Sequence, residues 1–409
     1  MTASDSDLRP VAEAAVPSWR GGFGRLWSAA VVSRLGDGLR AAALPLFAVG
    51  LTDSPILVSL VTAAGFLPWI LFGLLGGAIA DRVDQRRAMW AVDAARCALM
   101  AGFTLAVGLD EVSIALLLVL AFVLTTMQTL FDNAATALLP SVVPTAGLGR
   151  ANARLMTGQT IAGTFLGAPL VPVLLGLSAA LPFAADAATY LIAAALVASI
   201  RMPPRERAPR AAGRTLRQDI AEGIRTLWRD RVLRSLCTAN TIVNTGVGAL
   251  IATLVLHVTG WLHAGHAGYA AVLTAYGAGS VAGGLAAGRI SELLGRIRAL
   301  VLGLLFQTGA LAVLGTVRSL PVAVGVMAVF GAVGMLWNVN EVTLVQERTP
   351  PALLGRVSAA NRTLSIAGAP LGALLGGAVA TAWGLNTPAL AAAALFACGV
   401  IALLPAVIN

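Results

Sequence analysis

Pro144-Thr145-Ala146-Gly147-Leu148-Gly149-Arg150 recurs 206 residues later as Pro350-Pro351-Ala352-Leu353-Leu354-Gly355-Arg356, so the chain carries the pattern P-x-x-x-L-G-R twice. The surrounding sequence keeps nearly the same spacing, since Gly76-Gly77 falls opposite Gly283-Gly284. In a chain of 409 residues, an offset of this size indicates that one structural unit is used twice.

The composition places both copies of this unit in a lipid bilayer. Hydrophobic residues make up 58% of the chain and charged residues 11%, and the mean hydropathy is +0.84, whereas a soluble domain carries about 25% charged residues. Apolar segments of roughly 20 residues, the length that crosses a bilayer, recur without the alternation that barrel strands show. We therefore predict an all-α polytopic membrane protein, with twelve transmembrane helices in two pseudo-symmetric six-helix bundles. The predicted spans are 24–49, 55–79, 88–108, 113–136, 155–176, 178–200, 236–257, 267–288, 298–317, 320–344, 359–382 and 388–407.

Arginine sets the predicted orientation of these spans. The chain has no lysine and a net charge of +9, and its arginines gather in alternate loops between the apolar segments. That pattern is typical of the positive-inside rule rather than of a nucleic-acid-binding surface. We expect a multi-pass protein of the cell membrane that binds no nucleic acid. Both termini and the central loop are expected in the cytoplasm, with Arg318 as the exception to the rule.

The repeat divides the chain into two bundles joined by a charged linker. Apolar residues recur at spacings of three and four from Leu216 to Leu227, which predicts an amphipathic helix at the membrane face. Paired membrane repeats are typical of secondary transporters, whose substrate site lies between the repeats. The predicted divisions are a cytoplasmic tail at 1–23, a first bundle at 24–200, the linker at 201–234 and a second bundle at 235–409.

The loop after the second span carries the most specific motif. It reads Gly77-Ala78-Ile79-Ala80-Asp81-Arg82-Val83-Asp84-Gln85-Arg86-Arg87, and Gly284-Leu285-Ala286-Ala287-Gly288-Arg289 stands at the same place in the second half. The sequence resembles the major facilitator superfamily, whose signature in this loop is G-x-x-x-D-R-x-G-R-[RK]. With Gly36-Asp37-Gly38 in the first span and Phe131-Asp132-Asn133-Ala134-Ala135 in the fourth, it is similar to the branch of enterobactin exporters and macrolide efflux proteins.

The resemblance implies that these loops form a latch, which holds the cytoplasmic side shut when the outside is open. The Asp81 carboxylate is well placed to meet the positive N-terminus of a helix from the other half. Asp132 is placed to pair with Arg82 or Arg86. The alternative is a set of charges that only holds the loops in the cytoplasm. The expected latch residues are Gly77, Asp81, Arg82, Arg86, Asp132, Gly288, Arg289, Gly295 and Arg296.

Charged residues inside the apolar segments are the leading candidates for a functional site, because a central charge costs roughly 2.5–3.5 kcal/mol on insertion. Asp37 lies near the middle of the first span, and Arg34 and Arg40 lie three residues away on the same helical face. Asp37 either exchanges a proton, or contacts a cationic substrate, or forms a permanent salt bridge with the two arginines. Asp93 and Arg96, three residues apart in the third span, are predicted to form a local pair.

Other polar residues within the spans form a second set of candidates. Glu341, near the cytoplasmic end of the tenth span, is a candidate for a second latch or for the proton-coupling path. Four amide side chains are candidates for the cavity lining, although hydrogen bonds between helices would also explain them. They are Gln159, Asn240, Asn244 and Asn338.

The predicted function is the export of a small molecule (a drug, antibiotic, siderophore or other metabolite) by alternating access. Gly163-x-x-x-Gly167-Ala168-Pro169 in the fifth span resembles the glycine–proline motif of antiporters, which favours exchange with protons. An importer of the same fold, and a receptor or assembly protein built on it, are the alternatives. The sequence shows no GxxxxGK[ST] motif, catalytic triad pattern or metal-ligand spacing, so we expect no enzymatic activity, cofactor or metal. We also expect the transporter to be a monomer.

Overall fold

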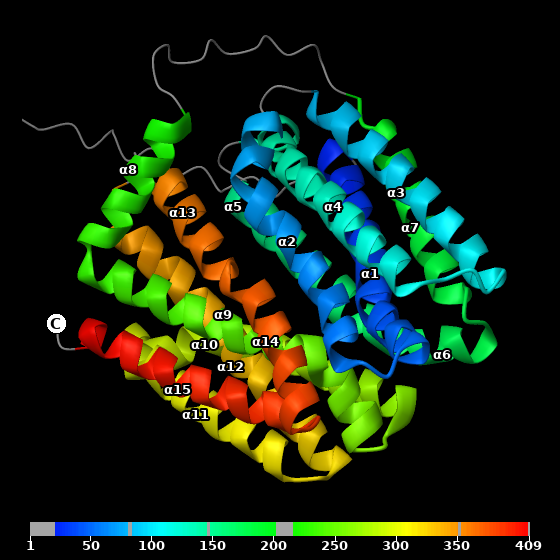
Figure 1. Ribbon diagram of the computed structural model, residues 1–409. Coiled ribbons are helices and arrows are strands. Elements are labelled where there is room, and N and C mark those ends of the chain that lie inside the picture. The colour runs from blue at the N-terminus through cyan, green and yellow to red at the C-terminus, as the bar shows by residue number, and fades with distance from the viewer. Residues whose placement is uncertain (1–20, 81–83, 145–147, 202–215, 351–352, 408–409) are drawn as a thin grey trace, which may run out of the picture.

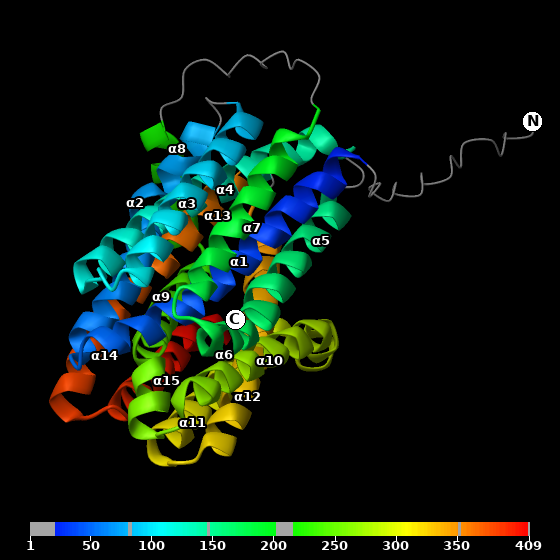
Figure 2. The ribbon, with the colours of Figure 1, turned by 90° about the vertical axis from the view of Figure 1, so that its right-hand side faces the viewer.

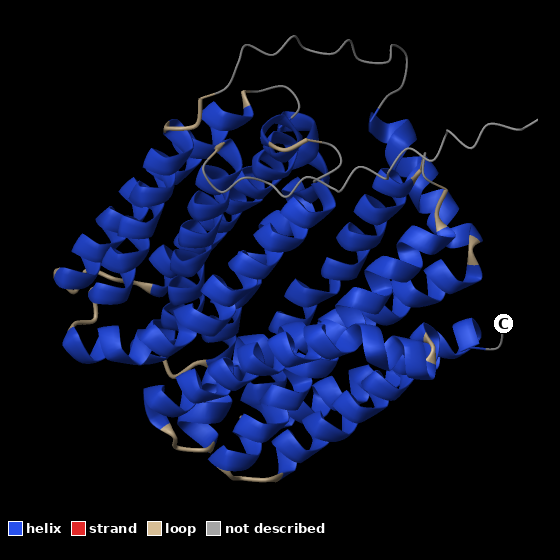
Figure 3. Cartoon of the chain, turned by 180° about the vertical axis from the view of Figure 1, so that it is seen from behind, coloured by secondary structure: helices blue, strands red, loops and turns tan. Residues whose placement is uncertain are grey.

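The computed structural model describes residues 21–80, 84–144, 148–201, 216–350 and 353–407. In these residues the regular structure is helical throughout, and long helices run side by side, joined by short loops (Figures 1 and 3). The predicted all-helical membrane fold is confirmed.

Twelve helical stretches cross the described part of the molecule, six in each half. Ten are recognisable as membrane spans by length and composition alone. α1 (Gly22–Leu51) is long enough but carries charged residues in its middle. The fifth stretch is divided into α5 (Leu148–Thr160), the π-helical η2 (Ile161–Gly167) and α6 (Ala168–Leu177). The other stretches are α2 (Pro55–Ala80), α3 (Gln85–Gly108), α4 (Ile114–Val142), α7 (Leu181–Ala198), α9 with η3 (Arg231–Leu256, His257–Trp261), α10 (Gly265–Leu294), α11 (Arg296–Thr316), α12 (Leu320–Arg348), α13 with α14 (Leu354–Ile366, Gly368–Trp383) and α15 (Thr387–Val407).

The π-helical segment η2 brings the fifth stretch against α1. α1 lies beside both α5 and α7 (Figure 2) and packs directly on η2. Gly38 of α1 and Gly163 of η2 approach so closely that a methyl group on Gly38 would lie 2.0 Å from the Gly163 carbonyl oxygen. Glycine at this crossing lets the two backbones meet, and the wider π turns shift the helix axis where Pro169 follows.

The two bundles meet at one end of the molecule and diverge toward the other (Figure 1). α2 packs against α14, and α10 packs against η2 and α6, whereas α5 and α10 share almost no contact in the described residues. A methyl group on Gly377 of α14 would lie 2.7 Å from the Ser59 Cβ of α2. We call the end where α7 ends and α8 begins the linker end, and the opposite end the closed end.

The linker contains a helix, α8 (Leu216–Arg229), which packs against α13 of the second bundle. Arg356 Nη1 donates to Glu222 Oε2 at 2.6 Å, which joins the two helices. Leu227 of α8 is buried in an apolar cluster with Leu233 and Val357, while Trp228 on the same helix is 46% exposed. The linker helix is therefore part of the second bundle at the linker end.

Candidate functional site

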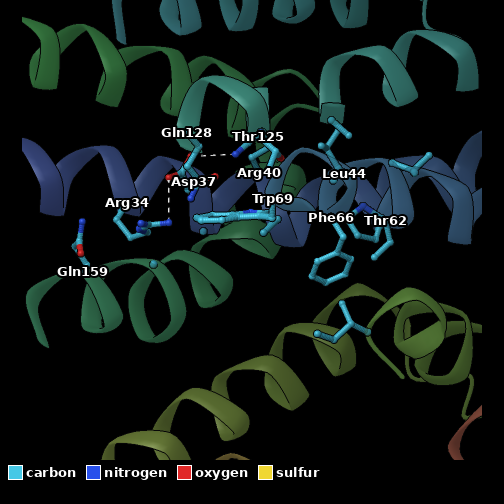
Figure 4. Close-up of a pocket in the computed structure, with 18 of the residues that line it drawn as sticks. Arg34, Asp37, Arg40, Leu44, Thr62, Phe66, Trp69, Thr125, Gln128 and Gln159 are labelled. Carbon is cyan, nitrogen blue, oxygen red and sulfur yellow. Dashed lines mark hydrogen bonds and ion pairs between the residues drawn. The ribbon is translucent and has the colours of Figure 1, made fainter. Parts of the chain in front are cut away.

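A central cavity of about 540 Å³ lies between the bundles (Figure 4). Most of its wall comes from the first bundle, from α1, α2, α4, α5 and η2, and Ile251 of α9 and Tyr269 of α10 complete it from the second bundle. Because residues of both halves line it, a ligand in this cavity touches both units of the repeat. The position agrees with the substrate site expected between paired repeats.

The cavity wall combines charged, aromatic and neutral polar side chains. Arg34, Asp37 and Arg40 present the charges from α1, while Phe66 and Trp69 of α2 supply aromatic surface (Figure 4). Apolar walls with a few converging polar groups are typical of small-molecule sites. The additional polar lining residues are Thr62, Thr125, Gln128, Gln159 and Thr160.

Asp37 is the centre of a charge network between four helices of the first bundle. Its Oδ1 accepts from Arg96 Nη2 at 2.5 Å, from the Tyr190 hydroxyl at 2.7 Å and from Arg40 Nη2 at 3.0 Å. Its Oδ2 lies 3.7 Å from Arg34 Nη1. With only 7% of its surface exposed, Asp37 is held as an ion by three arginines, which favours the salt-bridge interpretation of the sequence.

The network extends from Asp37 through its arginine partners. Arg34 Nη2 binds both carboxylate oxygens of Asp132 on α4, at 3.0 and 3.1 Å. Arg96 Nη1 lies 3.0 Å from Asp93 Oδ1, so the predicted local pair is confirmed. Arg40 Nε lies 3.7 Å from Asp186 Oδ2, but neither Asp186 oxygen has a hydrogen-bond partner in the described residues. In the part of the chain that the structure describes, the network thus contains three arginines and four aspartates.

Glu341 forms a separate polar site in the second bundle. Its Oε1 accepts from Asn240 Nδ2 of α9 at 2.7 Å and from Asn361 Nδ2 of α13 at 2.8 Å. The Asn244 amide donates to Asn240 Oδ1 at 3.0 Å, so the row of hydrogen bonds continues from Glu341 through Asn240 to Asn244. Three helices therefore share one buried carboxylate, which is 6% exposed.

The four amides expected in the cavity lining have different surroundings. Gln159 lies in the wall of the central cavity. Asn240 and Asn244 lie outside that lining, because their amides turn toward Glu341 and toward each other. Asn338 is exposed on α12 and is not among the cavity residues.

Several expected latch residues can be placed. Arg86 does not pair with Asp132, because it donates to the Val197 and Ala198 carbonyls at the end of α7, where a helix leaves acceptors free. In the second half, Gly288 and Arg289 are exposed, and a methyl group on Gly288 would meet nothing within 4 Å.

The remaining latch residues lie at the ends of helices or outside the description. Gly295, with a φ of 77°, makes the turn between α10 and α11, and Arg296 pairs with Glu347 of α12. Asp81 and Arg82 lie outside the described residues, and of Gly77 only the helical backbone is described.

Sequence reasoning missed the contacts that join different helices. The bonds from Arg96 to Asp37 and from Arg34 to Asp132 connect residues 59 and 98 positions apart. Asn361 was not singled out, and its only sequence signal was an amide within a predicted span. A charge in a span predicts that a partner exists, but it does not say on which helix the partner lies.

Two six-helix bundles around a central cavity are the architecture of a membrane transporter built from paired repeats. The chain belongs to the Major Facilitator Superfamily, which it matches over residues 26–365 and again over residues 236–408. It is a multi-pass membrane transporter of that superfamily.

Relatives with assigned functions include efflux proteins. The chain is 25% identical to the multidrug efflux pump Tap of Mycolicibacterium fortuitum over 383 residues, which cover 89% of this chain and 90% of the pump. It is 22% identical to macrolide efflux protein A of Streptococcus pyogenes over 375 residues, which cover 90% of this chain and 92% of that protein. The expected likeness to macrolide efflux proteins is confirmed.

A solved transporter has the same fold. A D323A mutant of the nucleoside transporter NupG superposes with a TM-score of 0.78 at 10% identity, over 93% of this chain and 99% of that one. At this identity, the likeness concerns the fold alone.

Proposed function

We propose that this transporter exports an amphipathic small molecule across the cytoplasmic membrane in exchange for protons. In this proposal the linker end faces the cytoplasm, as the arginine-rich loops of the sequence indicate. The structure then corresponds to the inward-facing state, in which the central cavity receives its substrate from the cytoplasm.

The observation that carries this proposal is the cavity together with the uneven packing of the bundles. α2 packs against α14 at the closed end, whereas α5 and α10 share almost no contact in the described residues, and the bundles diverge toward the linker end (Figure 1). A cavity accessible from one side only is the arrangement that alternating access requires. The efflux function of the relatives supports the outward direction.

The cavity lining supports an amphipathic substrate. Phe66 and Trp69 offer flat apolar surface, and the guanidinium of Arg362 on α13 lies 5.0 Å above the Trp69 ring. Gln128 and Gln159 offer hydrogen bonds to polar groups. A molecule that carries both apolar and polar groups matches this mixed lining.

The test is proton-driven uptake of a labelled macrolide and of ethidium into everted membrane vesicles. We expect uptake of at least one probe when an inward-acid proton gradient is imposed, and collapse of uptake with an uncoupler. Trp69→Ala should lower this uptake several-fold, whereas Val119→Ala, a change at a residue 60% exposed on α4, should not. Gradient-driven flux in right-side-out vesicles only would instead identify an importer.

A further inference from the structure

The two bundles hold their buried carboxylates in opposite ways. Asp37 in the first bundle lies within 3.7 Å of three guanidinium groups and accepts a hydrogen bond from Tyr190. Glu341 in the second bundle has no cation within 4.0 Å in the described chain, and it accepts hydrogen bonds from the neutral amides of Asn240 and Asn361. Both carboxylates are more than nine-tenths buried.

The surroundings of Glu341 contain few groups that could balance its charge. The titratable side chain nearest to it on α9 is the buried thiol of Cys237. On its own helix, the neutral indole of Trp337 lies one turn away and brings no positive charge. On α10, Ser291 donates to Asn340 instead of to Glu341.

The charged residues on the helices around Glu341 are engaged elsewhere or exposed. Arg362 of α13 lies over Trp69, and Arg356 of α13 binds Glu222. The others are Arg289 and Glu292 on α10, Arg296 and Arg298 on α11, Glu347 and Arg348 on α12, and Arg231 and Arg234 on α9.

A buried carboxylate without a cation is expensive as an ion, because amide donors only partly replace its hydration. Binding a proton removes that cost. The bonds from both amides end on Oε1, and the Trp337 indole is a third neutral donor beside the carboxylate, so Oε2 is the oxygen that we expect to take the proton. If Asp37 bound a proton, the three arginines around it would lose the negative charge that they share. Their positive charges therefore oppose protonation of Asp37.

We propose that Glu341 carries the exchanged proton, and that Asn240 and Asn361 transmit its charge state to α9 and α13. This inference rests on the proposed proton-driven export. In the ionised form, two charge-assisted bonds hold α9 and α13 against α12. When Oε2 takes up a proton, an O–H bond forms, the carboxyl becomes neutral and both amide bonds weaken. α13 is then freer to move, and it bears Arg362, which contacts Trp69 of the first bundle.

A distance measurement tests the inference without a substrate. Spin labels are placed at Arg87→Cys on α3 and Leu293→Cys on α10, exposed positions at the linker ends of the two bundles. Cys97, Cys237 and Cys398 are first replaced by alanine in the full chain. The distance between the labels is followed against pH in lipid nanodiscs. We expect a change of distance distribution as the pH falls, and the loss of this change in Glu341→Gln.

Controls separate a proton-carrying role from a merely structural one. Glu347→Gln removes an exposed carboxylate from the end of the same helix and should keep the response to pH. Glu341→Asp should keep it with a shifted midpoint, and Asp37→Asn, if it folds, should keep it as well. A pH response that persists in Glu341→Gln, or that is absent from the parent protein, overturns the inference.

The outcome is independent of the vesicle assay. If the label distance depends on Glu341 but neither probe is transported, the proposed export fails while the proton-linked conformational change stands. If a probe is transported in exchange for protons and Glu341→Gln transports it unchanged, only the assignment to Glu341 fails.

Discussion

At the scale of single residues, Arg96 holds the first bundle together. Its two Nη atoms contact Asp37, Asp93, Ser33 and Tyr190, and its guanidinium lies 4.0 Å above the Tyr190 ring. The side chain is fully buried. Each contact replaces hydrogen bonds to water that a buried polar group has lost. Removal of one member therefore leaves its buried partners without compensation.

Arg96→Met should lower the stability of the transporter by about 3–5 kcal/mol, because it leaves the Asp37 and Asp93 carboxylates buried without their shared partner. The measurement is the apparent melting temperature of the purified protein in detergent. The double variant Arg96→Met with Asp37→Asn should lose less stability than the sum of the two single variants, since the pair interacts directly.

The control for this experiment is Arg87→Met, because the Arg87 side chain is 81% exposed and its pair with Asp84 is on the surface. We expect a change within ~1 kcal/mol for that variant. Equal losses at Arg87 and Arg96 would contradict the central role of the buried network.

The sequence predicted the part of this network that lies on one helix. Arg34, Asp37 and Arg40 share a face because residues three apart on a helix are neighbours, and the same rule gave Asp93 with Arg96. The bond from Arg96 to Asp37 depends on how α1 and α3 both pack against α7, and helix spacing carries no information on that packing. The same holds for Asn240 and Asn361, which converge on Glu341 from two other helices.

At the scale of elements, the predicted spans lie close to the observed helices, because hydrophobic length is a direct requirement of the bilayer. The span predicted at 24–49 is α1 at Gly22–Leu51, and the span predicted at 388–407 is α15 at Thr387–Val407. The division of the fifth span was not predicted. Its π-helical turns lie where Gly163 packs on Gly38 of α1, and the sequence of the span alone does not reveal this contact with another helix.

Gly38→Ala should destabilise the crossing of α1 and η2. The added methyl group would lie 2.0 Å from the Gly163 carbonyl oxygen, and backbone atoms there have no room to yield. We expect a loss of about 1–3 kcal/mol, as for other overpacked interiors, measured as a lower apparent melting temperature.

Gly102→Ala on α3 provides the matched control, because a methyl group at that position would meet nothing within 4 Å. That change should leave stability unchanged or raise it by up to ~1 kcal/mol, since alanine favours the helix over glycine. If Gly38→Ala behaved like Gly102→Ala, the close crossing would not hold in the membrane.

At the scale of the whole molecule, the two halves share a scaffold but not their buried charges. The repeated P-x-x-x-L-G-R pattern begins a span in each half, at α5 and at α13. Among the described residues, four aspartates and three arginines lie in the network of the first half, whereas the second half holds one buried carboxylate between amides. A symmetric pair of bundles can rock about a central cavity, and under the proposal for Glu341 the proton would act on the second bundle, while the arginines of the first bundle keep Asp37 ionised.

Rocking requires the contact between α2 and α14 to open, so a covalent bond at that contact should stop transport. The double variant Ser59→Cys with Gly377→Cys places two thiols at this contact. A methyl group on Gly377 would lie 2.7 Å from the Ser59 Cβ. A slight separation of the helices brings the two Cβ atoms to the roughly 3.8 Å of a disulfide. In a background without native cysteines, we expect oxidation to abolish proton-driven uptake of the probe in everted vesicles, and a reductant to restore it. Each single cysteine variant should be insensitive to oxidation. Undiminished uptake by a fully cross-linked protein would show that the closed end does not open during transport, and alternating access about this contact would be wrong.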